Sequence, residues 1–363
     1  MLTAIPCIVM RGGTSKGPFF IAADLPADAP TRDRVLLAAM GSPDSRQIDG
    51  LGGADPLTSK VGIVARSERP GVDLDFLFGQ VLIDEGRVDT TPNCGNMLAA
   101  AGPFALERGL VQATGGLTKL RILTLNTGMV SEVSIETPAG RVNYEGQTRI
   151  DGVPGTAAPI PIVFLDVAGS VCGSLLPTGN VADVIDGVRA TCIDNGMPVV
   201  VMRAEAFGLT GYESRDELNA NRELKARIEA IRLPAGRMMN LGDVARKVVP
   251  KMSLVAPPRT GGSLCSRTFI PHECHAAVGV LGAVTLATAA VLPGSVAHGV
   301  ADVPKGDRKL VSIEHPSGEF SIELTTETAG GGVTVKQAAL LRTARMLMRG
   351  EVFVPASVWA GHR

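Results

Sequence analysis

The chain has 363 residues, a length that suggests about two domains. Its residues are 45% hydrophobic and 20% charged, which excludes a disordered chain. With 35 basic against 36 acidic residues and only 4% aromatics, the sequence lacks the basic surface and the stacking platforms that nucleic-acid binding requires.

The first half of the chain predicts mostly strands, in which alternating apolar residues bury one face. The expected strands are 7–11, 61–65, 72–78, 121–126 and 130–136. A sharp turn at Gly12-Gly13 follows the first strand. Two helices are also expected: 31–40, with Thr31 as its N-cap, and 97–108, which is apolar nearly all round.

The second half shows a similar succession. Its expected strands are 191–194, followed by a turn at Asn195-Gly196, then 199–203 and 321–325. Ser214 and Glu217 form a capping box for a helix that is expected to end before Pro234. A second helix that is apolar all round is expected over 276–292, and Gly330-Gly331-Gly332 predicts a hairpin turn.

A helix that is apolar on every side must be surrounded, so we expect strands wrapped around each of the two apolar helices. Gly12 precedes Cys94 by 82 residues, and Gly196 precedes Val278 by the same 82. This spacing favours a duplicated α+β unit. The boundary is expected near 177–185, and the last segment is expected to return to the first half.

The number and spacing of the cysteines indicate the cellular compartment in which the protein is expected to act. Six cysteines without a CxxC pair favour reduced thiols in a cytoplasmic enzyme, and the N-terminus carries no signal-peptide pattern. Residues 276–301 contain no Asp, Glu, Lys or Arg, but glycines and Pro293 interrupt them. We therefore expect a helix buried inside a domain there and no membrane span.

Asn93-Cys94-Gly95-Asn96 precedes the first apolar helix. With Asn93 as a cap, the free N–H groups at the start of that helix could bind an anion and make the Cys94 thiol more acidic. The alternative is a small buried hydrophobic residue beside a cap, and position alone does not decide between the two.

Lys60 ends the glycine-rich loop 49–60 and begins an apolar strand. A lysine held away from water can act as a general base, and Thr58 and Ser59 offer hydroxyls to a ligand. Base rates alone favour an exposed lysine at a strand end.

Residues 11–17 resemble a phosphate loop but lack the Walker A spacing, so an ordinary hairpin is favoured; Arg11 and Ser15 could still face a carboxylate. His272, Cys274 and His275 lack a fourth zinc ligand at a recognised spacing. No metal is expected, and Arg267 and His275 are better interpreted as anion contacts.

Taken together, these motifs resemble the PrpF-like isomerases. The resemblance rests on Arg-Gly-Gly-Thr-Ser-Lys-Gly at 11–17, Asp-Gly-x-Gly-Gly-Ala-Asp-Pro-Leu-Thr-Ser-Lys at 49–60, Asn-Cys-Gly-Asn at 93–96, Asp-Asn-Gly-Met-Pro at 194–198, Arg-x-Phe-Ile-Pro-His at 267–272 and Leu-Leu-Arg-Thr-Ala-Arg at 340–345. Within the family, the sequence is most similar to the group that acts on 4-oxalomesaconate in bacterial degradation of gallate, syringate and protocatechuate.

The resemblance implies an α+β, diaminopimelate epimerase-like fold with two pseudo-symmetric β-rolls, each wrapped around a central helix. It implies an N-terminal domain of 1–183 plus about 340–363, a C-terminal domain of 184–339 and an active site between them. The epimerases use one cysteine from each half. Cys94 matches the first, but the second position falls at or near Val278, which cannot carry a proton.

The resemblance also implies a cofactor-independent isomerase in which Lys60 and Cys94 are catalytic. Its expected substrate is a small unsaturated tricarboxylate, with allylic proton transfer in 4-oxalomesaconate as the reaction. The expected substrate-binding residues are Arg11, Ser15, Thr58, Ser59, Asn93, Gly95, Asn96, Met197, Arg267 and His275. Alternatives are a methylaconitate or methylitaconate isomerase, or a non-catalytic tricarboxylate-binding accessory protein of an aconitase-like enzyme. A homodimer is left open.

Overall fold

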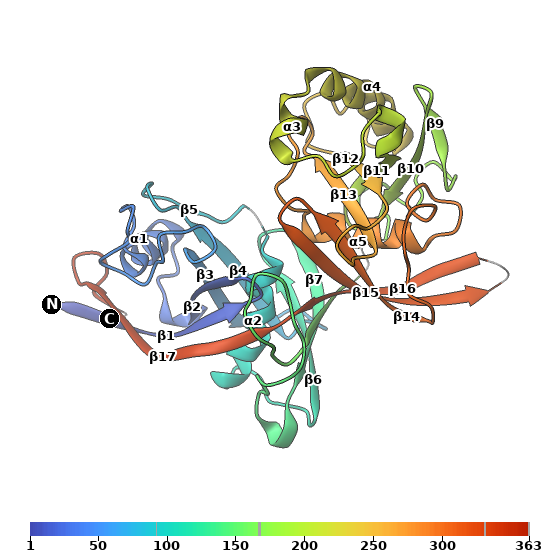
Figure 1. Ribbon diagram of the computed structural model, residues 1–363. Coiled ribbons are helices and arrows are strands. Elements are labelled where there is room, and N and C mark those ends of the chain that lie inside the picture. The colour runs from blue at the N-terminus through green and yellow to red at the C-terminus, as the bar shows by residue number, and fades with distance from the viewer. Residues whose placement is uncertain (92, 166–167, 330–331, 362–363) are drawn as a thin grey trace. The chain divides into compact units, whose positions relative to one another are not determined.

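The computed structural model describes residues 1–91, 93–165, 168–329 and 332–361, and the chain divides into two compact units (Figure 1). Unit 1 consists of Met1–Leu165 and Leu341–Arg363, and unit 2 of Asp166–Leu340. Strands dominate both units, as the sequence predicts.

Unit 1 is a mixed sheet with two helices. Its strands are β1 (Leu2–Gly12), β2 (Ser15–Ile21), β3 (Lys60–Arg66), β4 (Leu74–Val81), β5 (Val88–Asp89), β6 (Leu117–Thr124), β7 (Met129–Glu136), β8 (Ile160–Phe164) and β17 (Ala344–Pro355). They pair in the order β17-β1-β2-β3-β4-β6-β7-β8, and β5 pairs with the end of β4. Short 3-10 turns lie at Ala22–Asp24 and Pro138–Gly140.

Helix α2 (Gly95–Glu107) is the core of unit 1. It contacts β1, β2, β3, β4, β7, β8 and β17, so the sheet rolls around it. Nine successive residues of α2, from Met97 to Ala105, are buried. The helix that is apolar all round is therefore confirmed, together with the strands that surround it.

Helix α1 (Ala29–Met40) covers the opposite face of the same sheet. Its apolar residues share one hydrophobic cluster with residues of β1, β2, β3 and β17. Its N-cap is Asp28 and not Thr31, because the Asp28 Oδ1 accepts a hydrogen bond from the Thr31 N–H. Since β3 is covered on both faces, its first five residues are all buried, and the expected alternation over 61–65 is wrong.

Unit 2 has strands β9 (Asp183–Ile185), β10 (Val188–Asp194), β11 (Pro198–Arg203), β12 (Lys251–Ala256), β13 (Leu264–Phe269), β14 (Arg308–His315), β15 (Gly318–Ala329) and β16 (Gly332–Arg342). They pair in that order. A 3-10 turn lies at Ala204–Phe207. The glycine turn expected at 330–332 falls mostly on residues 330 and 331, which lie outside the described residues.

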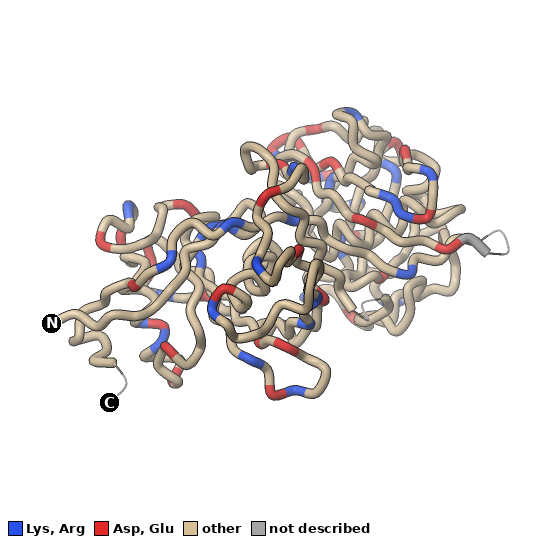
Figure 2. Tube along the Cα trace, turned by 90° about the horizontal axis from the view of Figure 1, so that it is seen from below, with Lys and Arg blue, Asp and Glu red and all other residues tan. Residues whose placement is uncertain are grey.

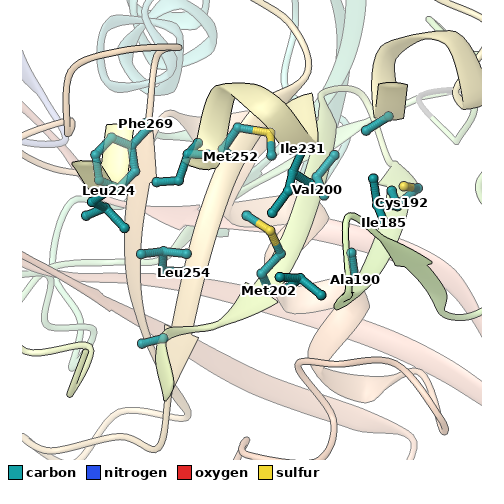
Figure 3. Close-up of a cluster of buried hydrophobic side chains, with 14 of the residues drawn as sticks. Ile185, Ala190, Cys192, Val200, Met202, Leu224, Ile231, Met252, Leu254 and Phe269 are labelled. Atoms are coloured by element: carbon teal, nitrogen blue, oxygen red, sulfur yellow. The ribbon is translucent and has the colours of Figure 1, made fainter. Parts of the chain in front are cut away.

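Helices cover both faces of this second sheet. Helix α5 (Val280–Val291) contacts β10, β11, β14 and β15, and α3 (Arg215–Ala220) and α4 (Arg222–Met238) lie on the other side of β10–β13 (Figure 1). Leu224 and Ile231 of α4 pack with Met252 and Leu254 of β12 in the core shown in Figure 3.

Three helix boundaries in unit 2 differ from the expectations. The capping box of Ser214 and Glu217 is confirmed, but α3 stops at Asn221, whose side chain caps a new helix. Helix α4 then continues through Pro234 to Met238, because its apolar face is buried against the sheet. Helix α5 begins only at Val280, after the N-cap Gly279.

The two units repeat one pairing pattern. From β1 to β8, successive neighbours pair antiparallel, parallel, antiparallel, parallel, antiparallel and antiparallel. The series from β10 to β16 has the same pattern. The central helices α2 and α5 occupy corresponding places before β6 and β14. This confirms the expected α+β, diaminopimelate epimerase-like fold of two β-rolls, each around a central helix.

Along the chain, the first segment of unit 1 ends at Leu165, which is earlier than the domain boundary expected at 183. The difference has a physical cause. The Asp194 carboxylate of β10 accepts hydrogen bonds from the N–H groups of Val171 and Cys172, and the Gly169 N–H donates to the Asp194 carbonyl. These contacts attach the segment before β9 to unit 2.

The distribution of charged residues agrees with the near-equal numbers of basic and acidic residues in the sequence. Lys and Arg are interspersed with Asp and Glu along the tube in Figure 2. All six cysteines are free. None of the helices within the described residues is long and apolar enough to cross a membrane.

Candidate active site

Lys60 is the first residue of β3 and is only 8% exposed. Its Nζ lies 5.0 Å from the centre of the Phe78 ring and donates a hydrogen bond of 2.5 Å to the Gln80 Oε1. Burial lowers the pKa of Lys60, while the nearby Cys94 and Asp55 side chains oppose that shift. The expectation of a lysine held away from water agrees with this geometry, and the exposed strand end favoured by base rates does not.

The side chain of Gln80 holds Lys60 and its loop together. Gln80 lies opposite Lys60 in the β3–β4 pair, and its Nε2 donates to the carbonyls of Pro56 and Ser59 at 3.1 and 2.9 Å. One amide thus fixes both the amine and the loop that precedes it. No motif in the sequence points to Gln80. Strand alternation could have found it, because Gln80 is the polar residue on the face of β4 that carries Leu74, Phe76 and Phe78.

Cys94 is the N-cap residue of α2, and its side chain is partly exposed. Its backbone is extended, and its carbonyl accepts the first helical bond from the Leu98 N–H. The expected cap Asn93 therefore lies one residue before the actual cap, and its Oδ1 has no hydrogen-bond partner among the described residues. The N–H groups of Gly95 and Asn96 open the helix, where backbone donors and the helix dipole favour an anion.

Asn96 connects the start of α2 with the β1–β2 hairpin. Its Nδ2 donates to Thr14 at 2.9 Å and to Ser15 at 3.5 Å, and its Oδ1 accepts from the Arg342 Nε at 2.9 Å. Burial lowers the pKa of Arg342 to about 10, and charge on Cys94 opposes that shift. Arg342 is therefore a cation near Cys94. No local sequence pattern predicts this role, because its partner Asn96 lies 246 residues away.

The other expected residues of unit 1 have different environments. Thr58 is partly buried, with its hydroxyl 3.3 Å from the Asp55 carbonyl. Ser59 is completely buried and donates to the Gln47 Oε1, so its hydroxyl holds the loop. Arg11 bonds to the carbonyls of Gly13 and Thr343. Side chains alternate along β1: Gly12 faces α2, so Arg11 faces the other side of the sheet and is not brought together with Lys60 and Cys94.

Three expected binding residues belong to unit 2. Arg267 of β13 is 7% exposed; its Nε donates to the Glu213 carbonyl, and it lines a cavity of about 580 Å³ with Ser214 and Arg215. Burial lowers the pKa of His275, whose Nδ1 accepts from the Ala277 N–H.

Met197 lies in the β10–β11 turn, where its carbonyl accepts from the Thr285 hydroxyl of α5 at 3.0 Å. This contact matches the one that Asn96 of α2 makes with the β1–β2 turn in unit 1. In each unit, a polar side chain of the central helix therefore holds the first hairpin.

The position that corresponds to the second epimerase cysteine, and the histidines and cysteine considered as zinc ligands, also have definite places. Val278 is buried just before the N-cap Gly279, and neither residue can carry a proton. His272 is half-exposed and lies 3.9 Å from Glu229, whereas Cys274 is buried. Within the described residues, no three His, Cys, Asp or Glu side chains are grouped to hold a metal ion.

The chain matches the family model described as PrpF protein over residues 2–355. It is 61% identical over 353 residues to a (4E)-oxalomesaconate Delta-isomerase from Novosphingobium sp. (strain KA1), covering 97% of this chain and 98% of that protein. It is 56% identical over 359 residues to a 4-oxalomesaconate tautomerase from Pseudomonas putida, covering 99% and 98%.

More distant relatives include a 3-methylitaconate isomerase from Eubacterium barkeri and a 2-methyl-aconitate isomerase from Shewanella oneidensis, each 37% identical and covering at least 95% of both chains. A crystal structure of methylitaconate-delta-isomerase has a TM-score of 0.83 and 36% identity, and the match covers 98% of this chain and 97% of that one. These matches extend over nearly the whole sequence and both units. The chain therefore belongs to the PrpF family.

Proposed function

We propose that this protein is an isomerase that moves an allylic proton within 4-oxalomesaconate without a cofactor. The observation that carries the proposal is the buried amine of Lys60, whose pKa is lowered and whose environment includes Cys94 at the start of α2. Relatives named for oxalomesaconate share 56–61% of their residues with this chain, whereas those named for methylitaconate and methylaconitate share 37%. The closer match favours oxalomesaconate.

The proposed reaction begins with the neutral Lys60 amine. It removes the acidic allylic proton next to the carbonyl-conjugated alkene, and the electron pair of that C–H bond delocalises into a dienolate. The N–H groups of Gly95 and Asn96 then stabilise the developing oxyanion. A proton is returned two carbons away, from the Lys60 ammonium or the Cys94 thiol, and the double bond has moved with no net change in protons.

Positive and polar groups are proposed to hold the carboxylates. In unit 1 these are Arg342, Thr58, Ser15 and Asn96, and in unit 2 Arg267, His275 and Met197. Ser59 and Gln80 are assigned to positioning Lys60 and its loop. Asn93 stays in the proposed set because its buried Oδ1 has no partner among the described residues. Action in bacterial aromatic-acid degradation and a cytoplasmic location remain proposals from the family resemblance and the free thiols.

Replacing the proposed base tests this function. Lys60→Met should abolish solvent deuterium exchange into oxalomesaconate, since an acid/base group contributes about 10²–10⁴ in rate. Lys119→Met is the matched control, because Lys119 is an exposed lysine of unit 1 that pairs with Glu132. Exchange in Lys60→Met at the control's rate would exclude Lys60 as the base.

Product analysis separates the alternatives within the proposal. A proton spectrum of the product formed in D₂O distinguishes keto–enol tautomerisation from 1,3-migration of the double bond. Parallel reactions with methylaconitate and methylitaconate identify the preferred substrate. A tricarboxylate-binding accessory protein would change none of these compounds.

A further inference from the structure

A row of three cations lies across three neighbouring strands of unit 1. Arg11 of β1 is directly opposite Lys16 of β2 on one side and Arg345 of β17 on the other. Residues opposite one another point to the same face of a sheet, and neighbouring strands lie about 4.7–4.9 Å apart. The Cα atoms of three cationic residues therefore lie side by side within about 10 Å, and their side chains leave the same face of the sheet.

This row faces away from the candidate active site. Ile5, Cys7 and Phe20, which share the phase of Arg11 and Lys16 along β1 and β2, pack against α1. Gly12 belongs to the other phase and meets Asn96 and Ala100 of α2. Because side chains alternate along a strand, the cations and the start of α2 lie on opposite faces of the sheet.

The cations border a cavity of about 740 Å³. It is lined by Arg11, Lys16 and Arg345, by Thr14 and Ser15 of the β1–β2 hairpin, and by residues of the loop 144–157. This volume is within the range of about 300–1,000 Å³ found for small-molecule sites. Within the described part of the chain, no ion pair neutralises any of the three cations, and Glu145 is the acidic residue in the lining.

The charges also oppose one another. Burial lowers the pKa of Arg11, and the positive charge of Arg345 lowers it further. Like charges placed directly opposite one another in a sheet are destabilising. The row of three cations therefore lowers the stability of unit 1 unless an anion in the cavity neutralises them. Arg11 is anchored to the Thr343 carbonyl and hydroxyl through one nitrogen, Nη1, so its position is fixed before any ligand arrives.

We propose that this cavity is a second anion site that binds a small polycarboxylate. It adjoins the candidate active site at Ser15, but its row of cations lies across the sheet from the start of α2. A molecule with two or three carboxylates spans the row, whereas a monocarboxylate reaches only part of it. Arginine pairs with carboxylates through two parallel hydrogen bonds, and Lys16 adds a point charge. The site needs no isomerase activity, so its test is independent of the proposed reaction.

Citrate binding to the full chain, measured by titration calorimetry, tests the site. The double variant Lys16→Gln/Arg345→Gln should weaken one citrate-binding event at least about tenfold, since each charge-assisted hydrogen bond is worth that much. The control Arg87→Gln/Lys119→Gln removes two exposed charges of unit 1 that form other ion pairs, and it should change citrate affinity less than twofold. Without citrate, the first double variant should melt at the same temperature or higher, because a repulsion has been removed.

Three results would overturn the proposal. The first is equal citrate affinity in the two double variants. The second is pyrophosphate or inorganic phosphate binding tighter than citrate at this cavity, which would assign it to phosphates. The third is a tenfold rise in the KM for oxalomesaconate in Lys16→Gln/Arg345→Gln with citrate acting only as a competitor, which would make the cavity part of the substrate site.

Discussion

The Gln80 amide and the Lys60 amine form the most informative pair at the residue scale. A general base must be neutral to accept a proton, so kcat/KM should rise with pH until Lys60 has lost its own proton and then level off. Because burial lowers the pKa of Lys60 below 10.5, that plateau should begin below pH 10.5. The Gln80 oxygen contacts the amine without adding charge, which leaves the neutral form accessible.

Gln80→Glu should reverse this effect. A carboxylate in contact with Lys60 favours its ammonium form and should raise its pKa by about 1–3 units. The rising limb of the kcat/KM profile should then move to higher pH by the same amount, with activity at neutral pH at least about tenfold lower. The measurement is a pH–rate profile between pH 6 and 10.

Gln112→Glu is the control for this change, since it adds the same charge at an exposed position after the C-terminal end of α2. Its profile should match that of the unchanged protein. An unshifted limb in Gln80→Glu would show that Lys60 is not the group that titrates.

At this scale, sequence patterns point to residues whose chemistry is local and not to those whose partners are distant. Lys60 and Cys94 are predicted from the sequence because each lies in a long, ordered motif beside its own glycines. Gln80 was missed because strand phase was used to find core residues and not to notice a polar side chain among them. Arg342 reaches Asn96 only after the C-terminal strand β17 returns to β1, a contact that no local pattern encodes.

At the element scale, the structure corrects the start of α1. Asp28 accepts from the Thr31 N–H, and these hydrogen bonds lower the pKa of its carboxyl. Asp28→Ala should therefore lower the stability of unit 1, because the Thr31 N–H loses its acceptor. Asp28→Asn keeps an acceptor oxygen, and asparagine caps helices about as well as aspartate, so its loss should be clearly smaller.

Urea denaturation followed by circular dichroism measures both variants. Equal loss in Asp28→Ala and Asp28→Asn would mean that charge, and not capping, is what Asp28 contributes. A sequence-based cap is easily misplaced here because Asp28 is followed by Ala29 and Pro30, and Pro is well tolerated in the first turn of a helix.

Packing decides where α4 ends. A proline usually stops a helix, yet α4 continues because its apolar stripe is buried against β10–β13. Ile231 lies in this stripe and is completely buried, so Ile231→Ala should cost about 2–5 kcal/mol. Val184→Ala, at a position 73% exposed in the same unit, should change stability by less than about 0.5 kcal/mol.

The thermal unfolding midpoints of these two variants are the measurement. A small loss in Ile231→Ala would mean that the core in Figure 3 is loosely packed and that another interaction carries α4 past Pro234.

At the scale of the whole molecule, the sequence revealed the duplication but not its limits. The matching 82-residue spacings and the two apolar helices follow from the pairing pattern that both units share. The strand order and the placement of 168–180 with unit 2 depend on contacts such as those of Asp194, which are distant along the chain. Apolar periodicity specifies which face is buried, but it does not specify which strand lies beside which.

The duplication also explains why the two halves are proposed to differ in chemistry. The central helix α2 of unit 1 has Cys94 as its N-cap residue, and Lys60 lies near it. The central helix α5 of unit 2 has Gly279 as its N-cap residue, preceded by Val278. Unit 2 is therefore proposed to supply binding groups, and it has no proton carrier at the corresponding place. If so, a change in unit 2 should affect substrate binding, and a change of Lys60 should affect turnover.

Arg267→Gln tests this division of roles. Removing the buried guanidinium should raise the KM for oxalomesaconate at least about tenfold with kcat changed less, because a charge-assisted bond to a carboxylate is present before and during the reaction. Lys60→Met should instead remove kcat. Arg189→Gln, which changes an exposed arginine of unit 2, is the control and should change neither kcat nor KM.

Because Arg267 also bonds to the Glu213 and Ser266 carbonyls, Arg267→Lys is needed as a partial rescue that keeps the charge. A fall in kcat alone, with KM unchanged and no rescue by lysine, would assign Arg267 to the fold of β13 and not to the substrate.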